Sequence, residues 1–145
     1  MRVDFYQLSR DPPEAVVARL AENTLDAGER LVVVCADRAR REAISRGLWC
    51  HSPESFLAHG EAGGAHDLRQ PILLSASVQA PNGARFIVLA DGVWRPEAEG
   101  FTRVFLLFGG PELEAARATW RLLGQRDEVE RHFWKQDGGK WRQGP

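Results

Sequence analysis

Two uninterrupted apolar runs, at 31–35 and 104–108, constrain the fold of this chain more than any other feature. Each run has the length of an ordinary strand and contains no charged side chain. A strand with one face in water alternates apolar and polar residues, whereas a strand covered on both faces is apolar throughout. The chain is therefore expected to be an α/β protein with a largely parallel sheet.

The segments around these runs show the periodicities of an alternating chain. Residues 2–8 predict a first strand, and apolar residues at helical spacing predict helices at 14–28 and 37–48. This order of strands and helices implies right-handed crossovers and parallel pairing. The later elements predicted are strands at 71–74, 86–89 and 130–136 and a helix at 112–124.

The middle of the chain is less regular. Residues 52–70 contain several glycines and little periodicity, so a long surface loop is expected there. The turn sequence at 81–83 predicts a hairpin between the strands at 71–74 and 86–89. No linker or shift in composition divides the chain, so residues 1–145 are expected to form one domain.

Charge and composition exclude several classes of protein. Nineteen Lys and Arg face 20 Asp and Glu, for a net charge of −1, whereas proteins that coat nucleic acid usually carry a basic excess. No apolar stretch reaches the ~18 residues of a membrane span, and residues 1–4 begin no signal peptide. Cys35 and Cys50 are too few for a disulfide scaffold, so reduced thiols and a cytoplasmic location are expected.

No motif for catalysis, cofactor binding or metal binding stands out, so none of these is expected. The first strand-to-helix turn has no glycine that would let a phosphate approach, and the glycines at 109–110 lack the Lys and hydroxyl of a phosphate loop. Ser55 lacks the Gly-x-Ser-x-Gly elbow of hydrolases. The candidate metal ligands match no zinc spacing; they are Cys50, His51, His59 and His66.

The predicted third helix carries an indole between two arginines. Arg117 and Trp120 are surface neighbours at a spacing of three, and Arg121 lies one turn beyond Arg117. Guanidinium groups beside an indole can recognise an anion attached to an apolar group, such as the last residue of a peptide. Alternatively, Trp120 completes a core stripe and both arginines face water. That stripe would consist of Leu113, Ala116 and Leu123.

Other large aromatic residues follow the second helix and lie near the C-terminus. Trp49 and Phe56 flank a segment that could present both rings to a partner, since interfaces favour such anchors. Alternatively, that segment folds back onto the core. Trp134 and Trp141 are expected to pin the chain end to the sheet.

The same residues carry a family likeness. The segments FYQL at 5–8, LW at 48–49, PESFLAHG at 53–60, QPILL at 70–74, PNGA at 81–84 and WKQ at 134–136 occur in this order. Their combination and spacing resemble the chi subunit of bacterial DNA polymerase III holoenzyme, over about residues 3–142.

This resemblance implies a fold, a function and partners. The fold would be one three-layer α/β/α, Rossmann-like domain around a mostly parallel, mixed sheet. The function would be that of a non-catalytic accessory of the clamp loader, active at replication forks in the cytoplasm and without a cofactor. Its partners would be the psi subunit, which tethers it to the clamp loader, and the acidic C-terminal tail of single-stranded DNA-binding protein, which ends in a phenylalanine carboxylate. Nucleic acid would be reached only through these partners, and no membrane would be involved.

The resemblance also implies roles for particular residues. The family's tail-binding positions fall on Phe108, Arg117, Trp120 and Arg121. Its psi-facing aromatic residues fall on Trp49 and Phe56. The chain departs from the family at Leu113, where some members carry a basic residue, so weaker binding of the acidic part of the tail is expected.

Two other functions compete with this one. A small-ligand protein or enzyme would use the crevice at the carboxyl ends of the strands, near Ser9, Ala36 and Gly109, where the sequence offers few polar groups. Direct binding of nucleic acid would use a cluster of arginines on the second helix, which Glu42 interrupts. This cluster consists of Arg38, Arg40, Arg41 and Arg46.

Overall fold

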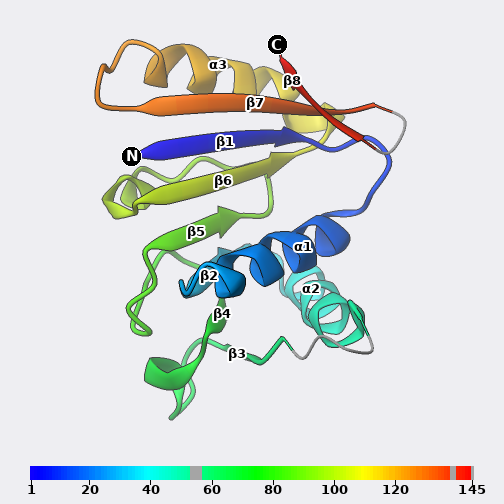
Figure 1. The fold of residues 1–145 in the computed structure, drawn as a ribbon, viewed down its shortest axis with the longest axis vertical. Helices are drawn as coiled ribbons and strands as arrows, with labels where there is room; N and C mark the ends of the chain where they lie inside the picture. The colour runs from blue at the N-terminus through cyan, green and yellow to red at the C-terminus, as the bar shows by residue number, and fades with distance from the viewer. Residues whose placement is uncertain (53–56, 138–139, 145) are drawn as a thin grey trace.

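The computed structural model describes residues 1–52, 57–137 and 140–144, and the strands of this part form one eight-stranded sheet (Figure 1). The strands are β1 (Arg2–Gln7), β2 (Leu31–Val34), β3 (His59–Glu61), β4 (Ile72–Ser75), β5 (Phe86–Leu89), β6 (Arg103–Phe108), β7 (Glu130–Asp137) and β8 (Lys140–Gly144). The α-helices are α1 (Pro13–Asp26), α2 (Arg38–Cys50) and α3 (Leu113–Leu123). Short 3-10 helices lie at Asp67–Arg69, Pro96–Gly100 and Gly110–Glu112.

The strand order is β3-β4-β2-β5-β6-β1-β7-β8, and only β7 and β8 pair antiparallel. Parallel strands that follow one another in the chain require crossover connections, because the chain must return to the same end of the sheet. Helix α1 makes that connection between β1 and β2, and α3 makes it between β6 and β7. The prediction of an α/β fold with a mostly parallel, mixed sheet is therefore confirmed.

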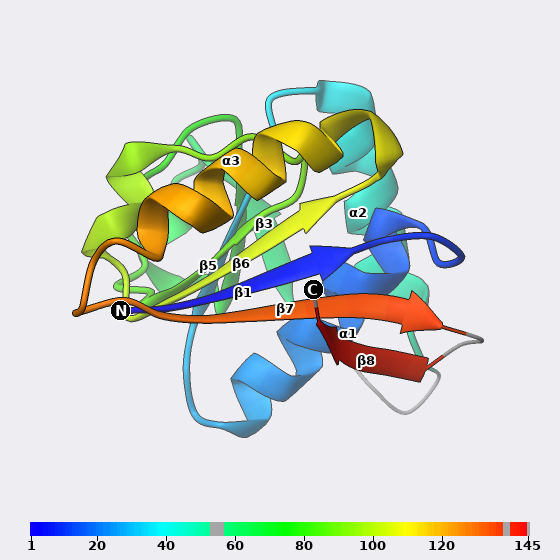
Figure 2. The ribbon, with the colours of Figure 1, turned by 90° about the horizontal axis from the view of Figure 1, so that it is seen from above.

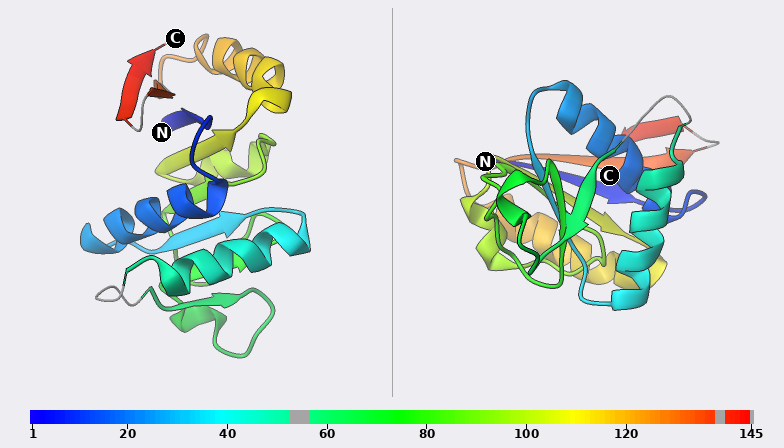
Figure 3. Two further views of the ribbon diagram at one scale, coloured as in Figure 1. Left: turned by 90° about the vertical axis from the view of Figure 1, so that its right-hand side faces the viewer. Right: turned by 90° about the horizontal axis from the view of Figure 1, so that it is seen from below.

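The α-helices cover both faces of the sheet (Figures 2 and 3). Helices α1 and α2 pack side by side on one face, and α3 packs on the other. Residues 31–35 divide accordingly. Leu31 and Val33 belong to the core on the side of α1 and α2, whereas Val32 and Val34 belong to the core on the side of α3. This burial on both faces explains the apolar run in the sequence and produces the expected three layers.

Local sequence signals place the helix starts. Helix α1 begins at Pro13, whose fixed φ suits the first helical position and whose missing N–H has no partner to lose there. Helix α2 is capped by Asp37, whose Oδ1 accepts a hydrogen bond from the Ala39 backbone N–H at 3.1 Å. The proline and the cap therefore fix the residue at which each helix begins after the preceding strand.

The predicted hairpin between β4 and β5 is wrong. Both strands run parallel to β2, one on each side of it. The turn does form, with Gly83 at a φ of 74°. It carries the chain past β2, because the buried Asn82 side chain donates Nδ2 to the carbonyl oxygens of Gln70 at 2.9 Å and Leu31 at 3.4 Å. A turn motif predicts a local reversal, but it does not decide which edge of a buried strand the chain joins next.

Two short strands lie where the sequence predicts none. The segment predicted as a loop at 52–70 contains β3, which pairs parallel with β4 at one edge of the sheet. The chain end contains β8, which pairs with β7 at the other edge. Strand β3 has only three residues, too few for a periodic pattern, and β8 is largely polar, as suits an exposed edge.

The two C-terminal tryptophans attach β7 and β8 to the rest of the sheet, as predicted. The Trp141 ring meets the Tyr6 ring edge-on, with 5.1 Å between centroids. The Trp134 ring is stacked near Tyr6 at 6.5 Å and donates its indole N–H to Asp4 Oδ1 at 3.1 Å. Burial, together with the charge of Asp4, raises the pKa of Tyr6 to about 12, so this ring stays neutral in the packed cluster.

Asp4 is a fully buried carboxylate that ties β1 to both of its neighbours. It accepts hydrogen bonds from Arg2 at 3.1 Å, from Arg103 on β6 at 3.0 Å and from Trp134 on β7 at 3.1 Å. Burial opposes its ionisation, but the hydrogen bonds from Arg2 and Trp134 and the charge of Arg103 outweigh that effect. Together they hold the pKa of Asp4 below its ordinary value of 3.8.

Replacement of Asp4 by Asn is expected to lower the free energy of unfolding by about 1–3 kcal/mol at pH 7, because the arginine and indole donors lose a charged acceptor. The contribution of the ionised carboxylate is present above its unfolded pKa and is lost as the pH falls through the lower folded value. The difference between wild type and Asp4→Asn should therefore shrink below about pH 4. Urea unfolding of both proteins, at pH 7 and below about pH 4, measures this difference in the free energy of unfolding.

The matched control is Glu42→Gln, which removes the carboxylate of the exposed Arg38–Glu42 ion pair. This change should alter stability by less than about 0.5 kcal/mol, since exposed pairs contribute little. Equal effects of the two substitutions at pH 7 would show that the Asp4 cluster does not stabilise the sheet.

Candidate functional site

The indole of Trp120 on α3 is partly buried and packs against the sheet. Its ring meets the Phe5 ring edge-on at 5.3 Å and the Phe133 ring edge-on at 5.5 Å. Ala116 and Leu123 on the same helix are buried, and Leu113 packs against the same core. Trp120 thus packs with the predicted core stripe, and two aromatic neighbours fix its partly exposed ring, while its role in binding a ligand stays a prediction.

The two arginines beside Trp120 reach solvent. The Arg117 side chain is 51% exposed and forms an ion pair at 3.2 Å with Glu114, which is 84% exposed. Such an exposed pair is worth little, so a ligand can replace Glu114 at small cost. Arg121 is exposed, and no ion pair of it occurs within the described residues. Together they place two cationic groups on the outer side of α3.

Arg131, which no motif in the sequence predicts, completes this cluster. Its guanidinium carbon lies 4.0 Å from the centroid of the Trp120 ring, and its Nη1 donates to the Trp120 carbonyl oxygen at 2.7 Å. Arg131 lies on β7 two residues before the buried Phe133, so both side chains point to the α3 side of the sheet. Strand alternation is the signal in the sequence that could have found it. We call Arg117, Trp120, Arg121 and Arg131 the α3 cluster.

Phe108 lies below this cluster. It is the last residue of β6 and is only 1% exposed. Its ring contacts the Phe133 ring at 5.6 Å, and Phe133 in turn contacts Trp120. Phe108 therefore belongs to the apolar core between the sheet and α3. Its role in binding a ligand stays a prediction.

A second candidate surface lies at the end of α2, where Trp49 is 50% exposed. Its ring lies beside that of His59, with 4.6 Å between centroids. His59 is held by contacts to Ser45 Oγ at 2.7 Å and to the Leu57 carbonyl oxygen at 2.8 Å. Phe56, the other predicted residue of this surface, lies outside the described residues.

The crevice at the carboxyl ends of the strands is mainly apolar. A cavity of about 250 Å³ opens there between the start of α1 and the segment before α3, and Arg40 and Glu112 are its charged residues. Few polar groups converge on it, which gives little support to the small-ligand alternative. No group of three or more metal-ligating side chains occurs in the described part of the chain. Cys35 and Cys50 are free thiols, and burial raises the pKa of the Cys35 thiol.

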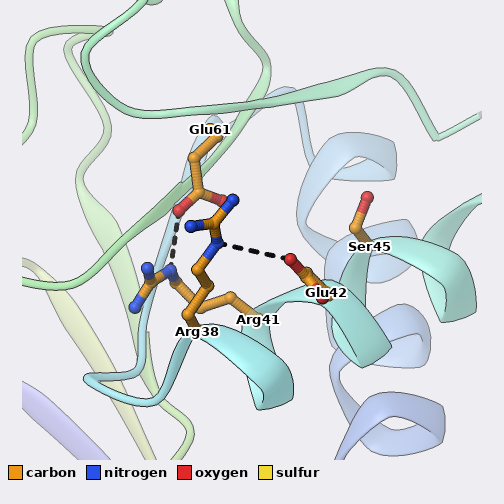
Figure 4. A pocket seen from close by; sticks show the side chains of 5 residues that line it. All are labelled: Arg38, Arg41, Glu42, Ser45 and Glu61. Atoms are coloured by element: carbon orange, nitrogen blue, oxygen red, sulfur yellow. Dashed lines mark hydrogen bonds and ion pairs between the residues drawn. The ribbon is translucent and has the colours of Figure 1, made fainter.

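A larger pocket, of about 430 Å³, lies beside α2 (Figure 4). Arg41 points from α2 to Glu61, with 2.6 Å between Nε and Oε1, and also donates to the Cys35 and Ala36 carbonyl oxygens. Arg38 pairs with Glu42 at 3.3 Å. Arg41, one of the four arginines that could bind nucleic acid, is therefore held by contacts within the protein, which weakens that alternative.

These features define an α/β protein with a half-exposed tryptophan at the end of α2 and a cluster of arginines and an indole on α3 and β7. The chain matches the family described as "DNA polymerase III chi subunit, HolC" over residues 1–130, and it belongs to this family. It is 36% identical over 107 residues to the DNA polymerase III subunit chi of Pseudomonas aeruginosa, covering 72% of this chain and 71% of that protein.

A second relative is more distant. The probable DNA polymerase III subunit chi of Rickettsia prowazekii is 26% identical over 84 residues, which cover 58% of this chain and 51% of that protein. The aligned part thus spans about half the length of this relative. As a chi subunit, the chain is a non-catalytic accessory subunit of DNA polymerase III. Within the described residues, no helix has the length and apolar character needed to cross a membrane.

The two tryptophans of these surfaces should differ sharply in their effect on stability. Trp120→Ala is expected to lower the free energy of unfolding by about 3 kcal/mol, because it removes a ring that packs on Phe5 and Phe133. Trp49→Ala should cost about 1 kcal/mol or less, because half of that side chain is already in water. Guanidinium unfolding of both variants measures the contrast, and a larger loss for Trp49→Ala would place Trp49 in the core.

Proposed function

We propose that this chi subunit links the clamp loader, through psi, to the C-terminal tail of single-stranded DNA-binding protein during DNA replication. Family membership supports a place in the DNA polymerase III assembly. The observation that carries the proposal for the tail is the α3 cluster, in which Arg131 lies against the partly buried Trp120 indole and the exposed Arg117 and Arg121 lie on the same helix as that indole. The cytoplasmic replication fork is the proposed place of action, and nucleic acid is reached only through the tail-bearing protein.

The chemistry of the α3 cluster matches a peptide that ends in a phenylalanine carboxylate and carries acidic residues before it. A carboxylate is bound best by a guanidinium, whose planar donors engage both oxygens. We assign this role to Arg117, with Arg121 supplying positive potential for the upstream acids. Trp120 supplies the apolar surface for the phenyl ring, and the buried Phe108 supports that surface from beneath through Phe133.

The proposed psi surface comprises Trp49 and Phe56. An exposed aromatic ring at the end of a helix is the kind of anchor that protein interfaces use. Helices α2 and α3 lie on opposite faces of the sheet (Figure 3). Because the two surfaces do not share a face, psi and the tail can bind at the same time, which a linking subunit requires.

Replacement of Arg117 by Ala is expected to weaken binding of a labelled tail peptide roughly 10- to 150-fold, through loss of a charge-assisted hydrogen bond worth about 1.5–3 kcal/mol. Arg117→Lys should restore only part of the affinity, because an ammonium lacks the paired donors. Wild-type binding should weaken as salt rises, since Coulomb attraction contributes. Fluorescence anisotropy titrations measure all three effects.

Arg38→Ala is the control for this titration. Like Arg117, Arg38 is an exposed arginine that pairs with a glutamate of its own helix, but that helix is α2. It should leave peptide affinity unchanged. If Arg117→Ala and Arg38→Ala bind the peptide equally well, the tail is bound elsewhere.

The double variant Trp49→Ala/Phe56→Ala is expected to abolish binding to psi and to leave both the fold and tail binding nearly intact. The reason is that the change removes apolar anchors from one surface and does not touch the α3 cluster. Co-purification with psi and titration with the tail peptide give the two readouts. Unfolding of the variant, or loss of both partners together, would show that these rings stabilise the core and do not form a separate docking surface.

A further inference from the structure

Arg131 is held in a fixed position against Trp120 of the α3 cluster. Two contacts to one residue orient it, since its guanidinium lies 4.0 Å over the Trp120 ring and its Nη1 donates to the Trp120 carbonyl oxygen at 2.7 Å. Stacking on an indole uses the flat face of a guanidinium and leaves its N–H groups, which lie in the plane, available for hydrogen bonds. Much of the entropy cost of fixing a long side chain has therefore already been met before any ligand arrives.

Gly124, directly after α3, provides the space for this arrangement. A Cβ atom at position 124 would lie 2.5 Å from the Arg131 guanidinium carbon, closer than real contacts allow. The backbone of Gly124 has a φ of −66°, which any residue can adopt. A side chain at position 124 would therefore displace the Arg131 guanidinium, whereas the backbone conformation would not oppose it.

The charge of Arg131 is not neutralised within the described residues. Arg126, in the segment between α3 and β7, pairs with Glu99 and Glu128, and Arg117 pairs with Glu114. Among the described residues, no carboxylate forms an ion pair with Arg131. Its single hydrogen bond uses one of five N–H donors. A partly exposed, oriented and unpaired guanidinium is well suited to bind an anionic group.

We propose that Arg131 is a second guanidinium of the tail site and binds the C-terminal carboxylate of the peptide together with Arg117. This inference rests on the proposed function and adds a residue from β7 to a site otherwise formed by α3. Trp120 follows Arg117 by three residues on α3, which makes the two surface neighbours, and its ring centroid lies 4.0 Å from the Arg131 guanidinium carbon. The phenyl group attached to the carboxylate then meets the exposed part of this indole.

The test compares two forms of one tail peptide, one with a free C-terminal carboxylate and one with a C-terminal amide, on wild type and Arg131→Gln. Wild type should prefer the free acid roughly 10-fold, the size of one charge-assisted hydrogen bond. Arg131→Gln should lose a measurable part of this preference, because only Arg117 then binds the carboxylate, and should bind the amide peptide almost as wild type does. Arg38→Gln serves as the control for the change in net charge and should keep the full preference.

Gly124→Ala provides a second variant, which retains the charge of Arg131 but displaces its guanidinium. It should also reduce the preference for the free acid. The amide peptide reports on the integrity of the site, because a disrupted site binds both forms less well. Equal losses for both forms, or an unchanged preference in Arg131→Gln, would show that Arg131 only attaches α3 to β7 and would overturn the inference.

A wild-type protein that binds neither peptide would overturn the proposed tail function, and the assignment of Arg131 with it. Failure of the inference alone gives a different result. In that case wild type and Arg131→Gln both bind the peptide and prefer the free acid to the same extent. Isothermal titration at low and physiological salt gives the affinities for all combinations of variant and peptide.

Discussion

Burial of the central strands on both faces is the constraint on which the rest of this structure depends. Strands β2 and β6 are buried along almost their whole length, so helices must cover each face of the sheet. Helices α1 and α2 cover one face, and α3 covers the other. This division places the Trp49 surface and the α3 cluster on opposite sides of one sheet, an arrangement that suits the proposed link between two partners.

Trp120 shows how one residue can serve both core and surface. Its contacts with Phe5 and Phe133 stabilise α3 on the sheet, and the same contacts fix the indole on which Arg131 lies. A ligand site built on a core residue is already ordered in the free protein, which lowers the entropy cost of binding. Asp4 has a comparable structural role on the other face, where three donors from three strands meet at one buried carboxylate.

Periodicity predicted the long elements well, because a helix or strand that buries one or both faces must carry apolar residues at matching spacing. The boundaries of α1, α2 and α3 lie close to the expected ones. The same method could not find β3, since three residues have no period, or β8, whose pattern is that of a polar edge. The turn at Asn82 and Gly83 was recognised, but its hydrogen bonds with Gln70 and Leu31, which direct the chain past β2, link residues far apart in sequence.

The sequence by itself determined the α/β class, the largely parallel sheet and the likeness to chi subunits, because apolar patterning and local motifs are properties of short segments. It also placed Arg117, Trp120 and Arg121 on one helix, since their spacing is local. Only the tertiary structure decided that Phe108 lies under the cluster and that Arg131 lies over it. Both residues reach the site from strands that α3 covers, and contacts between strand and helix depend on packing, which no spacing within a segment encodes.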